Sequence, residues 1–320
     1  MYYVSEQTVR DLVSQDAVTE AVAGSFIALA QDDAVCFPIV RETLNYADAI
    51  FGFKSGFDRK TPVLGVKAGG LWPGNAARGV PNHQSTVVLF DENSGAPTAL
   101  VRATYLTALR TAAASALSIR CLARKDVTTL GIVGAGGQGA FQLAAALKER
   151  VFERVIVFDP NGGNAEALAS KAKDAGLTGE TATPEALAQQ SDVIITVTPA
   201  RQAILNADWV RPGTHLACMG ADTVGKQEVD AKLVAKARLF GDVPEQAVTL
   251  GECQHAFKEG LIKAADITTL GAVMNDTRPG RTSDDEITLF DSTGIALQDL
   301  SSTRLAVDAA KRADRLVTLD

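Results

Sequence analysis

The sequence predicts an α/β protein made of a parallel-sheet part and a mixed α+β part. After about residue 124, near-continuous apolar strands alternate with helices, which is typical of a parallel sheet covered on both faces. From Ala34 to about Leu100, short apolar runs are broken by glycine and proline, which indicates an antiparallel sheet or an open barrel. A chain of 320 residues is long enough for two such domains.

Composition and charge exclude several classes of protein. With 46% hydrophobic and 22% charged residues, the chain has the composition of a soluble globular protein. No apolar run approaches the ~20 residues that span a bilayer, so no membrane partner is expected. The first residues include acids and no apolar signal core, which predicts a cytoplasmic protein. A net charge of −7, with acids and bases mixed along the chain, provides no basic stripe for nucleic acid.

The cysteines indicate neither a disulfide framework nor a metal site. They are widely scattered, and the sequence has no CxxC pair and no cluster of cysteine with histidine. We therefore expect no bound metal and four free thiols, at Cys36, Cys121, Cys218 and Cys253.

The mixed part begins with a helix. Apolar residues recur at helical spacing over residues 9–31, which predicts one amphipathic helix. Strands are then predicted in "AVCFPIV", "TPVLGVKAGG" and "STVVLFDENSGAPTALV", where "DENSG" between two apolar runs indicates a hairpin turn. Residues 104–124, "TYLTALRTAAASALSIRCLAR", predict a long helix whose face of small residues suits close packing.

The parallel part alternates strands with helices. Strands are predicted in "TTLGIVGAG", "RVIVFD", "DVIITVTP", "THLACMGA" and "ARLFGDV", and helices in "GAFQLAAALKE", "NAEALASKAKDAG" and "TPEALAQQ". Gly176 is a typical stop for the second of these helices. Thr183 as N-cap, followed by Pro184, is a typical start for the third.

The stretch "GIVGAGGQGA" has the spacing of a turn that binds the pyrophosphate of a dinucleotide. Gly134, Gly136 and Gly139 follow a predicted strand and open a predicted helix. Gly134 would permit the tight turn, Gly136 the approach of the backbone to the pyrophosphate, and Gly139 the close packing of helix on strand. This context predicts a Rossmann-type domain, with a glycine turn that binds nothing as the weaker alternative.

An acidic residue predicts which dinucleotide is bound. Asp159 ends the next strand, about 20 residues after the last glycine, where it would accept hydrogen bonds from the adenine ribose hydroxyls. Its charge would repel a 2′-phosphate, and "FDPNGGN" contains no arginine to bind one. The sequence therefore favours NAD(H) over NADP(H).

Three charged residues are candidates for chemistry, and each has a structural alternative. Lys67 lies in the apolar, glycine-rich run "VLGVKAGGLWPGN", where its ammonium either serves a site or faces solvent from a strand. Arg110 lies near the start of its predicted helix, where the macrodipole disfavours a cation, so it indicates a bound anion or a surface salt bridge. Asp222 follows a predicted parallel strand, at the edge where ligands bind, and is a candidate acid or base or else a helix cap.

Five motifs, in this order and spacing, resemble the ornithine cyclodeaminase and mu-crystallin family over essentially the whole chain. They are "GVKAGGLWPGN", "LTALRTAAASA", "GIVGAGGQGAFQ", "GADTVGKQE" and "DSTGIALQDL". The resemblance implies a homodimer with a substrate-binding and dimerisation domain at residues 1–117 and 298–320. It implies an NAD-binding Rossmann domain at residues 118–297.

The resemblance also implies roles for individual residues. Lys67 and Asp222 match the family's catalytic lysine and aspartate. Arg41 and Arg110 match arginines that hold the α-carboxylate of the substrate. The glycine turn and the resemblance together predict the residues that contact the dinucleotide: Arg110, Thr111, Gly134, Gly136, Gly137, Gln138, Asp159, Thr198, Met219 and Ser292.

The family includes two kinds of chemistry, which the motif residues do not distinguish. Cyclodeaminases oxidise an amino acid, lose ammonia on ring closure and return the hydride, so NAD is not consumed. Imine reductases and amino-acid dehydrogenases transfer the hydride to or from the product. Both need a carboxylate clamp, a proton relay and a nicotinamide close to the substrate's Cα.

The strand before Lys67 favours a reductase. A pocket for ornithine requires an acidic residue there, and an ungapped alignment places Lys54 at that position. A lysine suits a second carboxylate better than an amine, unless it faces solvent from its strand. His83 is a further candidate partner for this carboxylate or a proton carrier, although a lone histidine before a strand is more often structural.

Residues 40–70 look most like family members that reduce iminosuccinate. We therefore expect NADH-dependent reduction of a small imino acid to an L-amino acid, with iminosuccinate and L-aspartate as the sharpest form of this hypothesis. The alternatives are ornithine cyclodeamination and a mu-crystallin-like binding role without catalysis.

Overall fold

The structure, a computed structural model, describes residues 1–319 and divides into two compact units. Unit 1 is Met1–Ala113 together with the segment from Ile295 onward, and unit 2 is Ala114–Gly294. The long predicted helix is α3, Thr104–Leu122, and the first division falls within it. The described residues contain no helix that combines the length and the apolar character needed to cross a membrane.

Unit 1 is built on a mixed sheet of eight strands. Their order is β18-β1-β7-β6-β5-β4-β2, and β3 pairs with β4. Neighbouring strands run antiparallel except for β1, which is parallel to β7, so the predicted antiparallel sheet is confirmed. The strands are β1 (Tyr2–Val4), β2 (Ala34–Cys36), β3 (Val40–Thr43), β4 (Ile50–Asp58), β5 (Val63–Leu71), β6 (His83–Phe90), β7 (Pro97–Arg102) and β18 (Val317–Thr318).

The predicted hairpin turn joins β6 to β7. Asp91 Oδ1 accepts hydrogen bonds from the backbone N–H groups of Asn93 and Ser94. Gly95 adopts φ +72°, in the left-handed region that glycine enters without a steric penalty. The turn chemistry therefore explains the hairpin locally.

The prediction of one helix over residues 9–31 is wrong. The chain forms α1 (Glu6–Leu12) and α2 (Gln15–Ala30), separated at Val13 and Ser14. The Ser14 hydroxyl accepts a hydrogen bond from the Ala17 backbone N–H and so caps α2. Apolar periodicity did not reveal this break because both helices bury apolar side chains.

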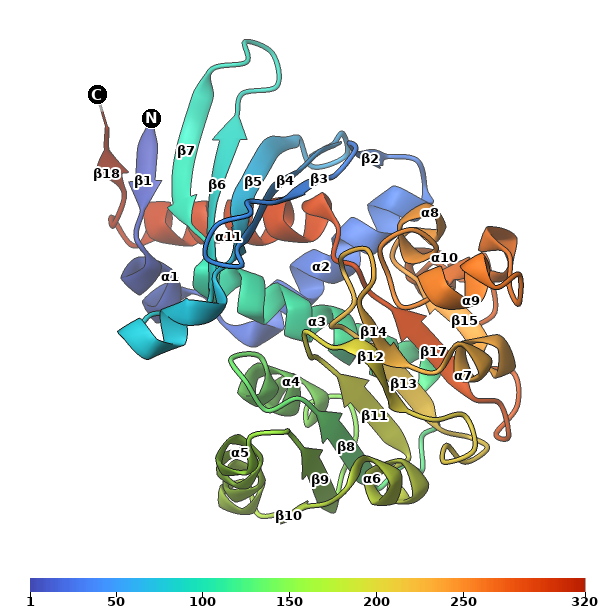
Figure 1. The fold of residues 1–320 in the computed structure, drawn as a ribbon. Helices are drawn as coiled ribbons and strands as arrows, with labels where there is room; N and C mark the ends of the chain where they lie inside the picture. The colour runs from blue at the N-terminus through green and yellow to red at the C-terminus, as the bar shows by residue number, and fades with distance from the viewer. Residues whose placement is uncertain (320) are drawn as a thin grey trace. The chain divides into compact units, whose positions relative to one another are not determined.

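One face of the unit 1 sheet is covered by the C-terminal helix α11, Ala296–Arg312 (Figure 1). This helix packs on β4, β5 and β6, and α2 packs alongside it. A Cβ at Gly65 would lie 2.7 Å from Leu300 Cδ2, so the strand admits the helix side chain only because it has glycine there. The 3₁₀ helix η1, Pro73–Arg78, follows β5.

Unit 2 contains the parallel sheet that the sequence predicts. Its order is β10-β9-β8-β11-β13-β17-β15-β16, and every neighbouring pair is parallel. The fold thus comprises a Rossmann-type domain and a mixed α+β domain, and the predicted fold class is confirmed. The strands are β8 (Thr129–Val133), β9 (Arg154–Phe158), β10 (Thr178–Thr181), β11 (Val193–Thr196), β13 (His215–Cys218), β15 (Arg238–Gly241), β16 (Thr268–Thr269) and β17 (Thr288–Asp291).

Helices and a small second sheet complete unit 2 (Figure 1). Strands β12 (Arg201–Leu205) and β14 (Gln227–Val229) pair with each other. As predicted, Thr183 caps α6 with its side chain and Pro184 is the first helical residue. The helices are α4 (Gly139–Ala146), α5 (Gly162–Asp174), α6 (Pro184–Gln190), α7 (Ala231–Lys236), α8 (Pro244–Ala247), α9 (Gln254–Lys258), η2 (Ala264–Asp266) and α10 (Leu270–Met274).

Candidate active site

A buried cluster of charged side chains lies in unit 1, between β5, α3 and α11. Lys67 Nζ lies 2.6 Å from Asp299 Oδ2, and Arg110 Nε donates to Asp299 Oδ1 at 3.0 Å. Arg110 Nη1 also donates to Gln298 Oε1 at 3.1 Å. Lys67, Arg110 and Asp299 are only 6%, 7% and 3% exposed. One carboxylate therefore binds two cations away from bulk water.

Strand alternation explains why Lys67 is buried. Lys67 lies two and four residues after Gly65 and Val63 on β5, so its side chain shares their face, which α11 covers. Lys54 lies directly opposite Lys67 on β4 and is also 6% exposed. The alternatives in which these two lysines face solvent are therefore wrong.

The strand register brings two further predicted residues to this face. Arg41 on β3 lies opposite Gly52, two residues before Lys54 on β4. His83 begins β6 and lies opposite Leu71, four residues after Lys67 on β5. Opposed residues of antiparallel strands point to the same side. Lys67 and the four candidates for substrate binding thus all belong to unit 1. All of them except Arg110, which lies on α3, share one face of the sheet.

The cluster changes the ionisation of its members. Burial lowers the pKa of Lys67 to about 8, and the nearby charge of Arg110 acts in the same direction. Burial alone would raise the pKa of Asp299, but the charges of Arg110 and Lys67 outweigh it, so that this pKa lies below its usual range. Asp299 is therefore ionised at neutral pH, and Lys67 can lose a proton near physiological pH.

Arg110 pairs with the Asp299 carboxylate, so it forms a salt bridge, but a buried one and not the surface salt bridge of the alternative. The bound anion stays a prediction. The bonds of Arg110 to Asp299 and Gln298 use two of the five N–H donors of the guanidinium.

The glycine turn of unit 2 has the geometry that a dinucleotide needs. Gly134 follows β8 with φ +102°, and a Cβ there would lie 2.8 Å from Val197 O. Nothing lies within 4 Å of a Cβ built on Gly136 or Gly137. A Cβ on Gly139 would lie 3.0 Å from Leu168 Cδ2, which explains the third glycine as a close helix contact. The residues present therefore fit a bound pyrophosphate.

The turn also lies at the position where such sheets bind ligands. Strand β8 pairs with β9 on one side and with β11 on the other, so the chain order changes direction there. Ligands of open parallel sheets bind at the carboxyl ends of the strands beside such a switch point.

Asp159 follows β9 and contacts the glycine turn. Its Oδ2 accepts a hydrogen bond from the Ala135 backbone N–H at 2.7 Å, and its Oδ1 accepts one from Asn161 N–H at 2.8 Å. Each carboxylate oxygen has a second lone pair, so the residue can also accept from ribose hydroxyls. The structure thus adds a role that the sequence did not indicate, because Asp159 also supports the turn.

The other predicted dinucleotide contacts have the following places. Thr198 and Met219 follow β11 and β13, Ser292 follows β17, and Gln138 precedes α4. The Ser292 hydroxyl donates to Asp242 Oδ2 at 2.9 Å. Thr111 lies on α3 in unit 1, where its hydroxyl donates to Thr107 O at 2.7 Å. Their contacts with NAD(H) stay predictions.

Asp222 is paired with a lysine that sequence reasoning missed. Lys226 Nζ lies 2.7 Å from Asp222 Oδ1 and donates to Gly220 O at 3.0 Å. The Thr223 hydroxyl donates to the same Asp222 oxygen at 3.1 Å. These donors suit the ionised carboxylate. Asp222 does follow a parallel strand, β13, as predicted.

Sequence reasoning also missed Asp299, although both missed residues lie inside quoted motifs. Asp299 is the second aspartate in "DSTGIALQDL", and Lys226 is the lysine in "GADTVGKQE". The signal for Asp299 was a charged residue within a helical segment whose other side chains are buried, as Leu297, Gln298 and Leu300 are. Nothing in the sequence named the partner of either residue.

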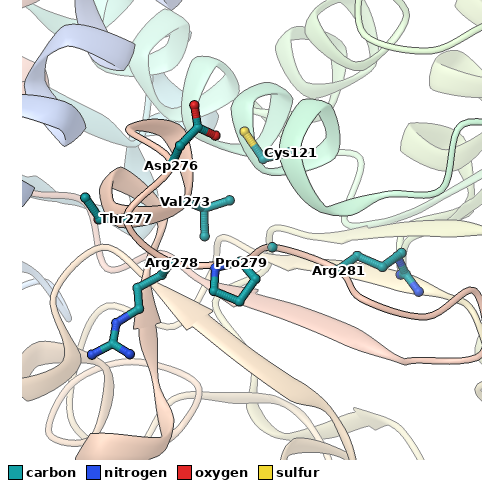
Figure 2. A pocket seen from close by; sticks show the side chains of 8 residues that line it. Cys121, Val273, Asp276, Thr277, Arg278, Pro279 and Arg281 are labelled. Carbon is teal, nitrogen blue, oxygen red and sulfur yellow. The ribbon is translucent and has the colours of Figure 1, made fainter.

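A cavity of about 430 Å³ in unit 2 contains none of the predicted site residues (Figure 2). It is lined by Cys121 and by residues 273 and 276–281. Arg281, whose side chain is shown in Figure 2, donates to the backbone carbonyls of Leu122 and Ser283. The described residues contain no group of three or more metal-ligating side chains, and the four cysteines are free thiols.

Comparisons with known proteins identify the family. Residues 8–314 match the model of the ornithine cyclodeaminase/mu-crystallin family. The iminosuccinate reductase of Paracoccus denitrificans (strain Pd 1222) is 45% identical over 311 residues, which cover 97% of each chain. The crystal structure of the iminosuccinate reductase of Paracoccus denitrificans in complex with NAD+ matches with a TM-score of 0.94 at 44% identity, covering 100% of this chain and 99% of that one. An archaeal alanine dehydrogenase dimer with bound NAD also gives 0.94, at 32% identity, with 100% and 99% covered. This chain therefore belongs to the ornithine cyclodeaminase/mu-crystallin family.

Proposed function

We propose that this protein uses NADH to reduce iminosuccinate to L-aspartate. At the coarser level of reaction class, the chain is an NAD(H)-dependent imine reductase or amino-acid dehydrogenase, and its substrate is a small imino or amino acid. The finer proposal is supported by one observation above all, which is that several basic side chains gather around the buried Asp299 carboxylate in unit 1.

The cluster contains four cations and one carboxylate. The charges of Arg110 and Arg41 both act on Lys67, and the charge of Lys54 acts on Asp299. Asp299 contacts Lys67 and Arg110, and cations that are buried require compensating anions. A substrate with two carboxylates provides such anions. Ornithine would instead bring a further ammonium.

Each cation has a proposed role in binding. Arg41 and Arg110 hold the α-carboxylate, for which Arg110 contributes donors beyond those that bind Asp299 and Gln298. Lys54 or His83 holds the second carboxylate. Arg41, Lys54 and His83 project from strands of one sheet and Arg110 from helix α3, so their spacing is fixed before the substrate binds.

The proton is supplied by Lys67 in this proposal. When bound, NADH supplies the hydride that adds to the imine carbon, while the C=N π electrons pass to nitrogen. Lys67 Nζ gives its proton to that nitrogen and recovers one from water after turnover. A pKa of about 8 suits this exchange near neutral pH. The Asp222 carboxylate, which pairs with Lys226, favours the protonated imine electrostatically in this proposal.

The test is NADH consumption by the purified protein in oxaloacetate plus ammonium, which form iminosuccinate in equilibrium. We expect rapid loss of NADH absorbance with aspartate as the product. Ornithine with catalytic NAD is the parallel reaction. Ammonia and proline from ornithine, without NADH loss in the first reaction, would overturn the reductase assignment in favour of cyclodeamination.

We also propose that the protein is a homodimer through the face of the unit 1 sheet opposite α11. Val40 and Phe53 are directly opposed on β3 and β4 and are 45% and 42% exposed. The Phe51 ring packs edge-to-face on Phe53 with centroids 5.3 Å apart. Exposed apolar clusters of this kind mark interfaces.

Light scattering during size exclusion tests the dimer. Phe53→Lys should give a monomer, because a charge would be buried in the interface. Val151→Lys changes an apolar residue of unit 2 that is 87% exposed and is the matched control. A dimer that persists in Phe53→Lys would place the interface elsewhere.

A further inference from the structure

Gly220, the second residue after β13, is held at both of its backbone polar groups. Lys226 Nζ donates to Gly220 O at 3.0 Å, and Glu228 Oε2 accepts from Gly220 N–H at 2.9 Å. The two side chains come from positions on either side of Gln227 on the chain, and both are buried. A cation thus holds the carbonyl oxygen of Gly220, and a carboxyl group holds its N–H.

The same two side chains reach residues of the proposed site. Lys226 Nζ lies 2.7 Å from Asp222 Oδ1. Glu228 Oε1 accepts from the Thr198 backbone N–H at 2.6 Å, and its Oε2 also accepts from the Thr196 hydroxyl at 2.7 Å. Glu228 therefore ties the carboxyl end of β11 to that of β13. Lys226 ties Asp222 to the same Gly220.

The packing around Gly220 leaves no room for another arrangement. A Cβ at this position would lie 2.4 Å from Thr198 O and 2.5 Å from Glu228 Oε1. The Thr198 carbonyl oxygen and the Glu228 carboxyl group occupy the space that a Cβ would need, so glycine is required there.

The segment that carries Lys226 and Glu228 is itself anchored. Lys226 O accepts hydrogen bonds from Gln254 Nε2 at 3.2 Å and from His255 Nε2 at 3.0 Å. The Glu228 backbone N–H donates to Glu252 Oε1 at 2.8 Å. A side chain that is fixed by its own backbone in this way can fix its partners.

We propose that Lys226 and Glu228 are positioning residues for the reaction, with Lys226 acting through Asp222 and Glu228 acting through the Thr198 turn on dinucleotide binding. The proposal rests on the proposed function, which makes Asp222 a catalytic residue and Thr198 a dinucleotide contact. It goes beyond that function because it assigns separate effects to the two side chains. Lys226 affects turnover, and Glu228 affects NADH affinity.

Lys226→Met tests the first assignment. We expect kcat to fall at least ~10-fold while the Kd for NADH changes less than ~2-fold, because Asp222 loses its charged donor. Lys226→Arg restores the charge and should recover part of kcat. In an Asp222→Asn background, Lys226→Met should have no further effect on kcat. Lys232→Met removes an exposed lysine of α7 and is the matched control.

Glu228→Gln tests the second assignment. A glutamine amide presents an NH₂ group to either Thr198 N–H or Gly220 N–H, so one bond is replaced by a clash of donors. We expect the Kd for NADH, measured by its fluorescence, to rise at least ~10-fold. The control is Glu180→Gln, because Glu180 lies on β10 and pairs with Arg154. If Glu228→Gln does not fold, Thr196→Val removes only the hydroxyl that binds Glu228 and should raise this Kd ~3-fold.

The outcomes separate this inference from the proposed function. Wild-type protein that binds NADH but reduces no imine would overturn the function, whereas the NADH titrations of the Glu228 and Thr196 variants still test the positioning role. Equal losses of kcat and NADH affinity in both Lys226→Met and Glu228→Gln would overturn the separate assignments. A further loss from Lys226→Met in the Asp222→Asn background would show that Lys226 does not act through Asp222.

Discussion

Units 1 and 2 each bury a lysine against an aspartate, and the surroundings of the two pairs differ in sign. Lys67 and Asp299 lie 2.6 Å apart among further cations. Lys226 Nζ lies 2.7 Å from Asp222 Oδ1. Lys226 and the buried carboxyl group of Glu228 both form hydrogen bonds with the backbone of Gly220. The first pair thus has further cations as neighbours, whereas the second has the carboxyl group of Glu228 nearby.

The buried charged side chains of the two units have different kinds of partner. The buried acids of unit 2 accept hydrogen bonds from backbone N–H groups, as Glu252 does from Glu228 and Val229, and Asp291 does from Cys253. Burial raises the pKa of these acids, that of Asp291 to about 7. In unit 1 the Asp299 carboxylate pairs with both Lys67 and Arg110. The comparison shows buried acids that hold backbone N–H groups in unit 2 and a buried acid that holds basic side chains in unit 1.

Replacing Lys67 should give the largest effect on turnover. In Lys67→Ala we expect kcat for the imine reaction to fall about 10³-fold, because the proton donor is lost. The Kd for NADH, measured by fluorescence, should stay nearly unchanged. Lys60→Ala, an exposed lysine of the same unit, is the control. Wild-type turnover in Lys67→Ala would remove this residue from the mechanism.

Replacing Asp299 should give the largest effect on stability. Asp299→Asn leaves Lys67 and Arg110 without their shared anion in a buried place, which costs about 3–5 kcal/mol of unfolding free energy. Asp308→Asn breaks an exposed pair with Arg304 and should cost about 0–1 kcal/mol. Urea unfolding of both variants measures the difference. Equal losses of unfolding free energy in the two variants would mean that Asp299 does not stabilise the unit 1 cluster.

Replacing Lys54 sharpens the charge argument for the substrate. Lys54→Met should lower kcat/KM for iminosuccinate about 10- to 100-fold, as expected for the loss of one charged hydrogen bond. The imine formed from pyruvate and ammonium has one carboxylate and should be affected less than ~3-fold. Parallel NADH assays with the two oxo acids measure this ratio. Equal losses for both substrates would exclude Lys54 as the partner of a second carboxylate.

A buried histidine of unit 2 gives the smallest predicted effect, on the pH dependence of stability. His215 contacts the hydroxyls of Ser118 and Thr288, and burial lowers its pKa to about 3. The unfolded chain binds a proton near pH 6.5, so this contribution to stability is complete above that pH and is lost as the pH falls toward 3. Between pH 7.5 and 5.5 the loss is about 1.4 kcal/mol.

Urea unfolding of wild type and His215→Gln at pH 7.5 and 5.5 measures this term. Wild type should lose about 1.4 kcal/mol more than the variant over this interval. Asp291 contributes with the opposite sign, since its raised pKa stabilises the fold as the pH falls, but it is present in both proteins and cancels. Identical pH dependence of the two proteins would mean that His215 is protonated in the folded state.

Local sequence patterns predicted most of the fold and missed its short elements. The long helix α3 has helical periodicity, and the buried strands of unit 2 are near-continuous apolar runs. Both formed as predicted. The break at Ser14 was missed because the apolar spacing continues across it. Strands β12, β14 and β16 were missed because they begin with polar residues, as "RQAIL", "QEV" and "TT" show, and so lack the continuous apolar run of β8, β11 and β13.

The sequence by itself determined the glycine turn, the acid that supports it and the charged candidates, because spacing and backbone constraints are local. Only the tertiary structure decided that Lys54 and Lys67 face the same buried cluster, since a shift of one residue in strand register would reverse both side chains. It also decided the partners of the functional charges. Asp299 comes from a helix 232 residues after Lys67, and a chain of that length carries no local signal of which distant charges folding brings together.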